Sequence, residues 1–221
     1  MRPASTGTSD DEPVRVVGER RHLVRRGYVL EGITLGWNVV GVVVLAIAAI
    51  SARSVALGGF GLDSLIEIVA STVVIWELSG TGGHRQRVAL RVIGVAFLVL
   101  ATYLGVQATI VLVAGWHARH SPLGIAWTAV TAGVMFALAA GKARTGRQLE
   151  NPVLVAESRV TLVDGVLATS VLLGLVLNAA AGWWWADPVA AYVLLLYGVK
   201  EGVADLRHAQ DVPRPRSTGL Q

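Results

Sequence analysis

Cysteine is absent from this sequence of 221 residues, and charged residues make up only 15% of it. Without thiols the chain can form neither a disulfide framework nor a thiolate metal site. Soluble domains carry roughly 25% charged residues. The low charge, together with a hydrophobic content of 53%, therefore excludes an ordinary soluble domain and predicts an integral membrane protein.

The few charges are mostly basic, which gives a net charge of +4 and a pI of about 10.0. The arginines lie beside long apolar runs, and no basic surface interleaved with aromatic residues appears, so we expect a lipid bilayer rather than a nucleic acid as the partner. The first 26 residues hold six arginines and no short apolar stretch followed by a cleavage site. We therefore expect no cleaved signal peptide.

Continuous runs of Leu, Val, Ala, Ile and Gly recur along the chain, and each can cross a hydrocarbon core of about 30 Å as a helix. They lack the alternating pattern of membrane β-strands. The expected spans are 28–50, 55–78, 92–114, 124–140, 152–179, and a last one from 188 to beyond 199. The predicted fold class is all-α: a bundle of six transmembrane helices within 27–206, a disordered tail at 1–26 and a short tail at 207–221.

Basic residues are distributed unevenly between the two sides of this bundle. Of the 19 Lys and Arg residues, all but Arg53, Arg119 and Arg159 fall in the two tails or in connections on the same side as the tails. Cytoplasmic connections are enriched in Lys and Arg, so both termini are predicted to be cytoplasmic, in a multi-pass protein of the inner (plasma) membrane. The three tryptophans at 183–185 suit the membrane–water interface on the opposite side of the bilayer.

Two acidic residues interrupt the second span. Asp63 and Glu67 are four residues apart, so both carboxyl groups lie on one helix face. A charge at the centre of a membrane helix costs about 2.5–3.5 kcal/mol, and such residues usually face protein, water or a cation. A divalent cation or a pair of protons would neutralise them. The alternative is a protonated pair that only packs and hydrogen-bonds between helices.

The fifth span carries Glu157, Arg159 and Asp164. Glu157 and Asp164 share a face but stand about 10 Å apart along the axis, so one ion cannot easily be held by both. Asp164 and Glu67 should meet near the membrane midplane. Glu157 lies about one turn inside the cytoplasmic end, where a solvated interface residue is the competing interpretation, and Arg159 should extend to that surface.

Other polar residues within the spans have simpler interpretations. Asn38, in the middle of the first span, can offer its carbonyl oxygen to a cation, and interhelical hydrogen bonding explains it equally well. Glu31, Glu77 and Glu201 lie near the inner ends of their spans and are interpreted as interface residues. Every histidine falls in a tail or a connection, so none is expected at a site within the membrane.

Together these residues resemble the cation diffusion facilitator family of cation efflux proteins. The segment Gly61-Leu62-Asp63-Ser64-Leu65-Ile66-Glu67 looks like the family's motif in the second helix, Asn38 like its asparagine in the first helix, and Ala186-Asp187-Pro188 like the start of its sixth helix. The resemblance spans nearly all of 28–201. It implies metal ligands at Asp63, Glu67 and Asp164, with Asn38 and Glu157 as further candidates.

The chain departs from the family pattern at two places. The family's ligand pair in the fifth helix aligns with Val160 and Asp164, so the first position is apolar here and Glu157 is the nearest replacement. The family usually carries a C-terminal cytoplasmic domain after the sixth helix, and we expect none here from the short stretch that follows the last span. A homodimer would therefore be expected to form through the membrane helices.

The resemblance implies a transporter, not an enzyme, that exports a divalent cation in exchange for protons by alternating access and has no resident cofactor. A non-transporting membrane protein that binds metal or assembles helices on the same fold is the alternative. Ligands that offer only oxygen favour manganese or iron on chemical grounds. Zinc is ranked first because it is the family's most common substrate and also accepts carboxylates.

Overall fold

A computed structural model describes residues 11–52, 55–80, 82–115, 122–181 and 186–212, and side-chain exposure within 18–51, 57–80, 82–115, 122–177 and 191–212. All regular structure in these residues is helical, which confirms the all-α prediction. The six helices are α1 Asp11–Ala52, α2 Val55–Leu78, α3 Gly83–Ala114, α4 Pro122–Gln148, α5 Pro152–Ala181 and α6 Ala186–Asp211.

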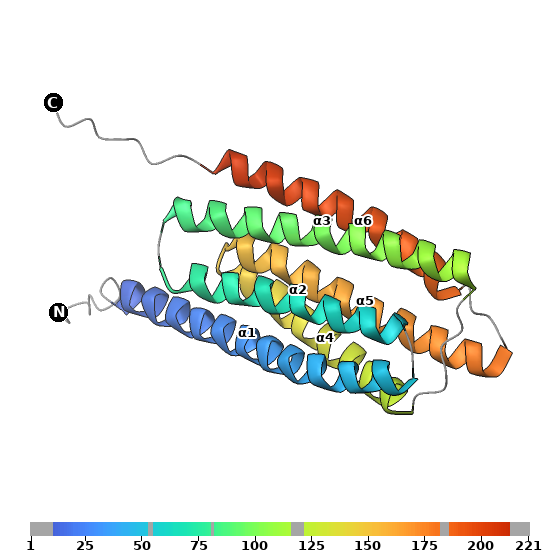
Figure 1. The fold of residues 1–221 in the computed structure, drawn as a ribbon. Helices are drawn as coiled ribbons and strands as arrows, with labels where there is room; N and C mark the ends of the chain where they lie inside the picture. Colours follow the sequence, from blue (N-terminus) through green and yellow to red (C-terminus); the bar gives the residue numbers. More distant parts are fainter. Residues whose placement is uncertain (1–10, 53–54, 81, 116–121, 182–185, 213–221) are drawn as a thin grey trace, which may run out of the picture.

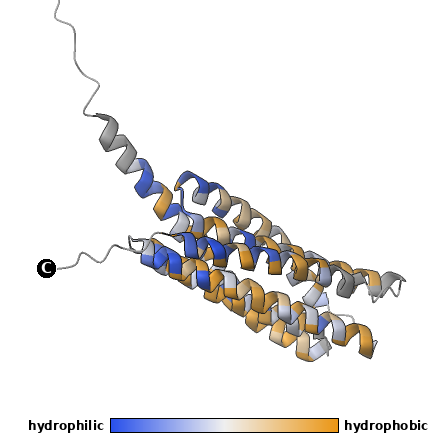
Figure 2. Cartoon of the chain, turned by 90° about the horizontal axis from the view of Figure 1, so that it is seen from above, coloured by the Kyte–Doolittle hydropathy of each residue, from blue (hydrophilic) through white to orange (hydrophobic). Residues whose placement is uncertain are grey.

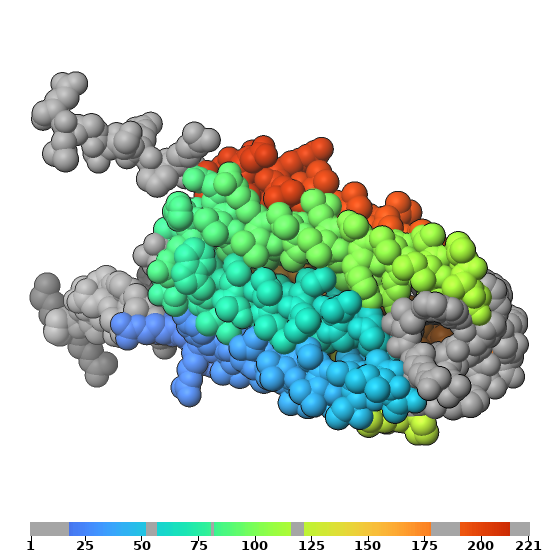
Figure 3. Space-filling model, viewed as in Figure 1, coloured from blue at the N-terminus to red at the C-terminus, as the bar shows by residue number. Residues whose placement is uncertain are grey.

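The helices lie along the long axis of the bundle, and successive helices run in opposite directions. Helix α1 therefore begins, and α6 ends, at the same end of the bundle (Figure 1). On one face α2 lies between α1 and α3, with α6 beside α3 (Figure 3). The most extensive helix pairings are α3 with α6, α4 with α5, and α1 with α2. Helix α2 also packs on α5, and this contact places the acidic faces of the second and fifth helices next to each other.

Small residues allow α3 and α6 to approach closely. A Cβ atom added at Gly94 would come within 2.9 Å of the Gly202 carbonyl oxygen, and one added at Gly202 within 2.8 Å of the Gly94 carbonyl oxygen. Such glycine contacts are typical of membrane helix pairs, which gain van der Waals packing from close backbones. Any larger residue at either position would separate α3 from α6.

The outer surface of the bundle is apolar. Val39, Val43 and Ile47 of α1, and Val95 and Val99 of α3, are each about half exposed. In the part of the chain that the structure describes, five helices are long and apolar enough to cross a membrane. They lie within Gly18–Ser51, Leu57–Leu78, Gly83–Ala114, Pro122–Gln148 and Pro152–Leu177. Hydrophilic residues gather at the end where α1 begins and α6 ends (Figure 2). This exterior suits lipid, as the composition predicted.

Four sequence expectations require correction. Helix α1 begins at Asp11, so much of the segment expected to be a disordered tail is helical. Helix α4 continues through Gln148, eight residues beyond the expected end of the fourth span at 140. Lys142, which had been counted among the connecting charges, is therefore inside a helix and fully buried, and Glu31, interpreted as an interface residue, is buried as well.

Candidate cation site

A regular stripe of buried positions on α1 explains where its polar side chains point. The stripe alternates steps of four and three residues, which keeps its members on one face of a helix. Its buried members are Gly27, Glu31, Thr34, Asn38, Gly41, Leu45 and Ala48. Glu31 and Asn38 thus lie on the same face, about 10 Å apart along the axis, and both enter the interior of the bundle.

Asn38, Asp63, Glu67 and Asp164 meet in the interior, and we call them the carboxylate cluster. Each is no more than 2% exposed. The Asn38 side chain donates a hydrogen bond to Glu67 Oε2 at 3.2 Å. The Asp164 carboxyl group interacts electrostatically with both Asp63 and Glu67. The structure thus brings together the residues that were predicted on α1, α2 and α5.

Several oxygens of this cluster accept no hydrogen bond from the described residues. They are Asp63 Oδ2, Glu67 Oε1 and both carboxyl oxygens of Asp164. Contact between two carboxyl groups is a hydrogen bond only when one of them carries a proton. When all three groups are ionised, the cluster therefore has several buried acceptor atoms without donors, and such atoms are costly unless protons or a cation satisfy them.

Glu157 lies in a second group, which we call the lysine cluster: Glu31, Ser71, Lys142, Glu157 and Thr161. The Lys142 ammonium is 2.6 Å from Glu157 Oε1 and 3.1 Å from Glu31 Oε2. It also donates to Thr161 Oγ1 at 3.0 Å, while Ser71 donates to Glu157 Oε1 at 3.3 Å. The structure therefore separates Glu157 from the other predicted ligands and pairs it with a cation of the chain itself.

Sequence reasoning missed Lys142 and Glu31 as interior residues, although a periodic signal was present. Lys142 follows the buried residues Met135 and Leu138 by seven and four positions, on the same stripe of α4. Glu31 precedes Asn38 by seven. Because helical residues seven apart share a face, extending both stripes by two turns would have placed these side chains inside.

Three further acidic residues, Glu77, Glu201 and Asp205, have partners on other elements. Arg159 pairs with Glu201 of α6 at 2.7 Å and approaches Asp205 at 3.6 Å, so it binds another helix as well as reaching toward the surface. Glu77 accepts a hydrogen bond from Asn151 at 2.9 Å. The tryptophans at 183–185 and the histidines at 117 and 120 lie outside the described residues.

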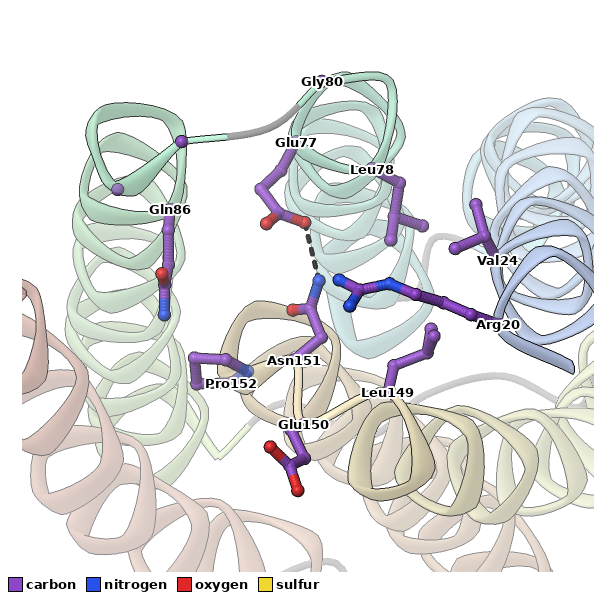
Figure 4. A pocket seen from close by; sticks show the side chains of 12 residues that line it. Arg20, Val24, Glu77, Leu78, Gly80, Gln86, Leu149, Glu150, Asn151 and Pro152 are labelled. Carbon is purple, nitrogen blue, oxygen red and sulfur yellow. Dashed lines mark hydrogen bonds between the residues drawn. The ribbon is translucent and has the colours of Figure 1, made fainter. Parts of the chain in front are cut away.

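A pocket of about 320 Å³ opens where α2 ends and α5 begins. Its lining includes Glu77 and Asn151, and Arg20 of α1 points into it toward Asn151 (Figure 4). None of the five predicted metal ligands lines this pocket. The pocket lies at the hydrophilic end of the bundle. Along the bundle, the lysine cluster lies between this pocket and the carboxylate cluster.

Among the described residues, no group of three or more His, Cys, Asp or Glu side chains is arranged to hold a metal ion as placed. Each carboxyl group of the carboxylate cluster interacts electrostatically with the other two.

Comparison with known proteins identifies relatives. The family model described as "Cation efflux transmembrane domain" matches residues 83–209, which cover α3, α4, α5 and nearly all of α6. Asp63 and Glu67 lie outside the matched residues. "Transmembrane protein 163" of Xenopus laevis is 25% identical over 211 aligned residues, which cover 87% of this chain and 72% of that protein.

Proposed function

Because this chain belongs to the cation efflux family, we propose that it exports a divalent metal cation in exchange for protons, by alternating access around the carboxylate cluster. Membership makes it a multi-pass membrane protein whose substrate is a cation, and a transporter rather than an enzyme. Beyond this membership, we propose which residues bind the cation, that protons move in exchange for it, and that zinc is preferred over manganese and iron.

The buried, donor-free oxygens of Asp63, Glu67 and Asp164 carry the proposal. They come from two helices that pack together, and α5 lies within the segment that matches the family. Carboxylate oxygens bind divalent cations, and Asn38 is positioned to orient Glu67 through its hydrogen bond. Binding requires the three carboxyl groups to rotate toward one point.

Charge balance sets the expected exchange ratio. The carboxylate cluster and the lysine cluster together hold five buried carboxyl groups, those of Glu31, Asp63, Glu67, Glu157 and Asp164, and one ammonium, that of Lys142. Uncompensated charge in a low-dielectric interior is costly. Neutrality therefore needs four protons when the site is empty and two when it holds a divalent cation. The proposed exchange is two protons for each metal ion, without net movement of charge.

Topology and surroundings follow the distribution of basic residues. We propose that both termini are cytoplasmic, that α6 is a sixth span, that the membrane is the inner (plasma) membrane and that the protein is a homodimer through its membrane helices. The pocket beside Glu77 and Asn151 would then open to the cytoplasm. The polar residues met along α2 between this pocket and the carboxylate cluster are, in order, Glu77, Ser71, Glu67 and Asp63.

A second candidate is a non-transporting membrane protein that binds metal or assembles helices on the same fold. Two observations favour it: Val160 is buried where the family carries a ligand, and the residues that the structure describes include no ready three-residue metal group. It predicts metal binding without metal movement.

Uptake of zinc into everted membrane vesicles separates the two candidates. Vesicles that contain the protein and carry an acidic interior should accumulate zinc, while vesicles with equal amounts of Asp63→Asn should not. Equal accumulation in both would remove Asp63 from the site. Zinc bound by the purified protein but never accumulated would support the non-transporting candidate.

A further inference from the structure

The lysine cluster is constructed like a cation site that already contains its cation. Three oxygens from three different residues surround one point: Glu157 Oε1 at 2.6 Å, Thr161 Oγ1 at 3.0 Å and Glu31 Oε2 at 3.1 Å from the Lys142 ammonium. Lys142, Glu31, Glu157 and Thr161 are all fully buried. Helices α1, α4 and α5 each contribute at least one of these four residues, so the cage is held by the packing of the bundle.

Two further oxygens near this point have no hydrogen-bond donor among the described residues. They are Glu31 Oε1 and Glu157 Oε2, the second oxygen of each carboxyl group. A single ammonium, with three hydrogens, cannot satisfy every oxygen around it. The cage therefore offers more oxygen atoms than its lysine uses, as a metal site would.

We infer that Lys142 is a tethered cation that occupies a second oxygen site for divalent cations and thereby limits the protein to one metal ion. Divalent cations bind oxygens at about 2.0–2.6 Å. Replacing the ammonium requires the cage to contract by less than about 1 Å. Carboxylate and hydroxyl oxygens favour a hard ion such as Mn²⁺ over zinc.

The inference adds to the proposed function without depending on its transport step. Because the covalently attached ammonium competes for the same oxygens at very high effective concentration, free metal does not replace it in the natural chain. Cargo is thereby confined to the carboxylate cluster, and Glu157 is kept out of the transport site. Lys142 acts as a positioning residue here, since it touches the cage and not the cargo.

The test measures bound Mn²⁺ per purified protein by equilibrium dialysis, with electron paramagnetic resonance to report oxygen ligation. Lys142→Ala should bind one more Mn²⁺ than the natural chain. Arg144→Ala, an exposed change two residues away on the same helix, should bind no more than the natural chain. Adding Glu31→Gln and Glu157→Gln to Lys142→Ala should abolish the extra ion.

One further variant and one further measurement make the outcome of this test decisive. Lys142→Ala made in Asp63→Asn should still gain one Mn²⁺, so a failure of the carboxylate cluster as a transport site is distinguishable from a failure of this inference. If Lys142→Ala is unstable, Mn²⁺ should restore its thermal stability, because the metal takes the place of the ammonium. No gain in bound Mn²⁺ by the folded variant, or no rescue of an unstable one, would overturn the inference.

Discussion

The two buried clusters contain similar residues but differ in what neutralises them. The lysine cluster has Lys142 within 3.1 Å of both of its carboxyl groups. The carboxylate cluster has three carboxyl groups that receive no hydrogen bond or ion pair from any Lys or Arg among the described side chains. A cluster with its own cation is structural, whereas one without it needs an exchangeable cation or protons. We propose that this contrast distinguishes a helix contact from a transport site.

Asp63→Asn should produce the largest effect on transport, because it removes one ligand charge from the cluster that has no internal cation. Losing one partner of a buried charged contact costs about 2–5 kcal/mol, which corresponds to a loss of metal affinity of about 30-fold or more. Transport in vesicles should fall to background, while thermal stability stays the same or rises.

Leu62→Ala, at the neighbouring position exposed to lipid, serves as the control for insertion and should transport normally. If Asp63→Asn transported metal at the wild-type rate, the proposed functional difference between the two clusters would be contradicted.

Glu157→Gln should show the opposite pattern, since it changes the cluster that already contains a cation. Breaking a buried ion pair costs about 3–5 kcal/mol, so thermal unfolding in detergent should occur at a clearly lower temperature. Transport per folded molecule should remain. Loss of transport without loss of stability would instead make Glu157 a ligand of the cargo, as one interpretation of the sequence held.

Val160→His should change which metal is preferred. Val160 is buried one turn from Asp164 on α5, and an imidazole there would add a nitrogen ligand, which zinc favours more strongly than manganese does. We expect the ratio of zinc to manganese uptake to rise about tenfold, or about 1.4 kcal/mol.

Val160→Leu controls for added volume and should leave the ratio as it is. An unchanged ratio in Val160→His as well would mean that position 160 does not face the carboxylate cluster.

Arg159→Gln should have the smallest effect. Its side chain is 34% exposed and pairs with Glu201 at the edge of the α5–α6 contact. Partly exposed ion pairs contribute about 1 kcal/mol or less, so the unfolding temperature should shift slightly and transport should persist. A large loss of transport in Arg159→Gln would instead show that the contact of Arg159 with α6 is needed for transport.

The sequence predicted the carboxylate cluster well because membrane burial makes each acidic residue conspicuous. The pair Asp63 and Glu67 could be read from spacing alone, and Asp164 from its depth in the fifth span. The partner of Glu157 could not be read this way, because Lys142 follows the apolar core of its span and resembles a basic residue of a connection. The packing of α4 against α5 shows that Lys142 faces inward, as the stripe of buried positions on α4 also indicates.

The most direct test of the account is to measure zinc and proton fluxes together in proteoliposomes that hold the purified protein, with the membrane potential clamped at several values. The account predicts that two protons move against each zinc ion, at a rate independent of the potential, and that Asp63→Asn abolishes both fluxes. Zinc movement without proton counterflow, or equal fluxes through Asp63→Asn, would contradict exchange at the carboxylate cluster.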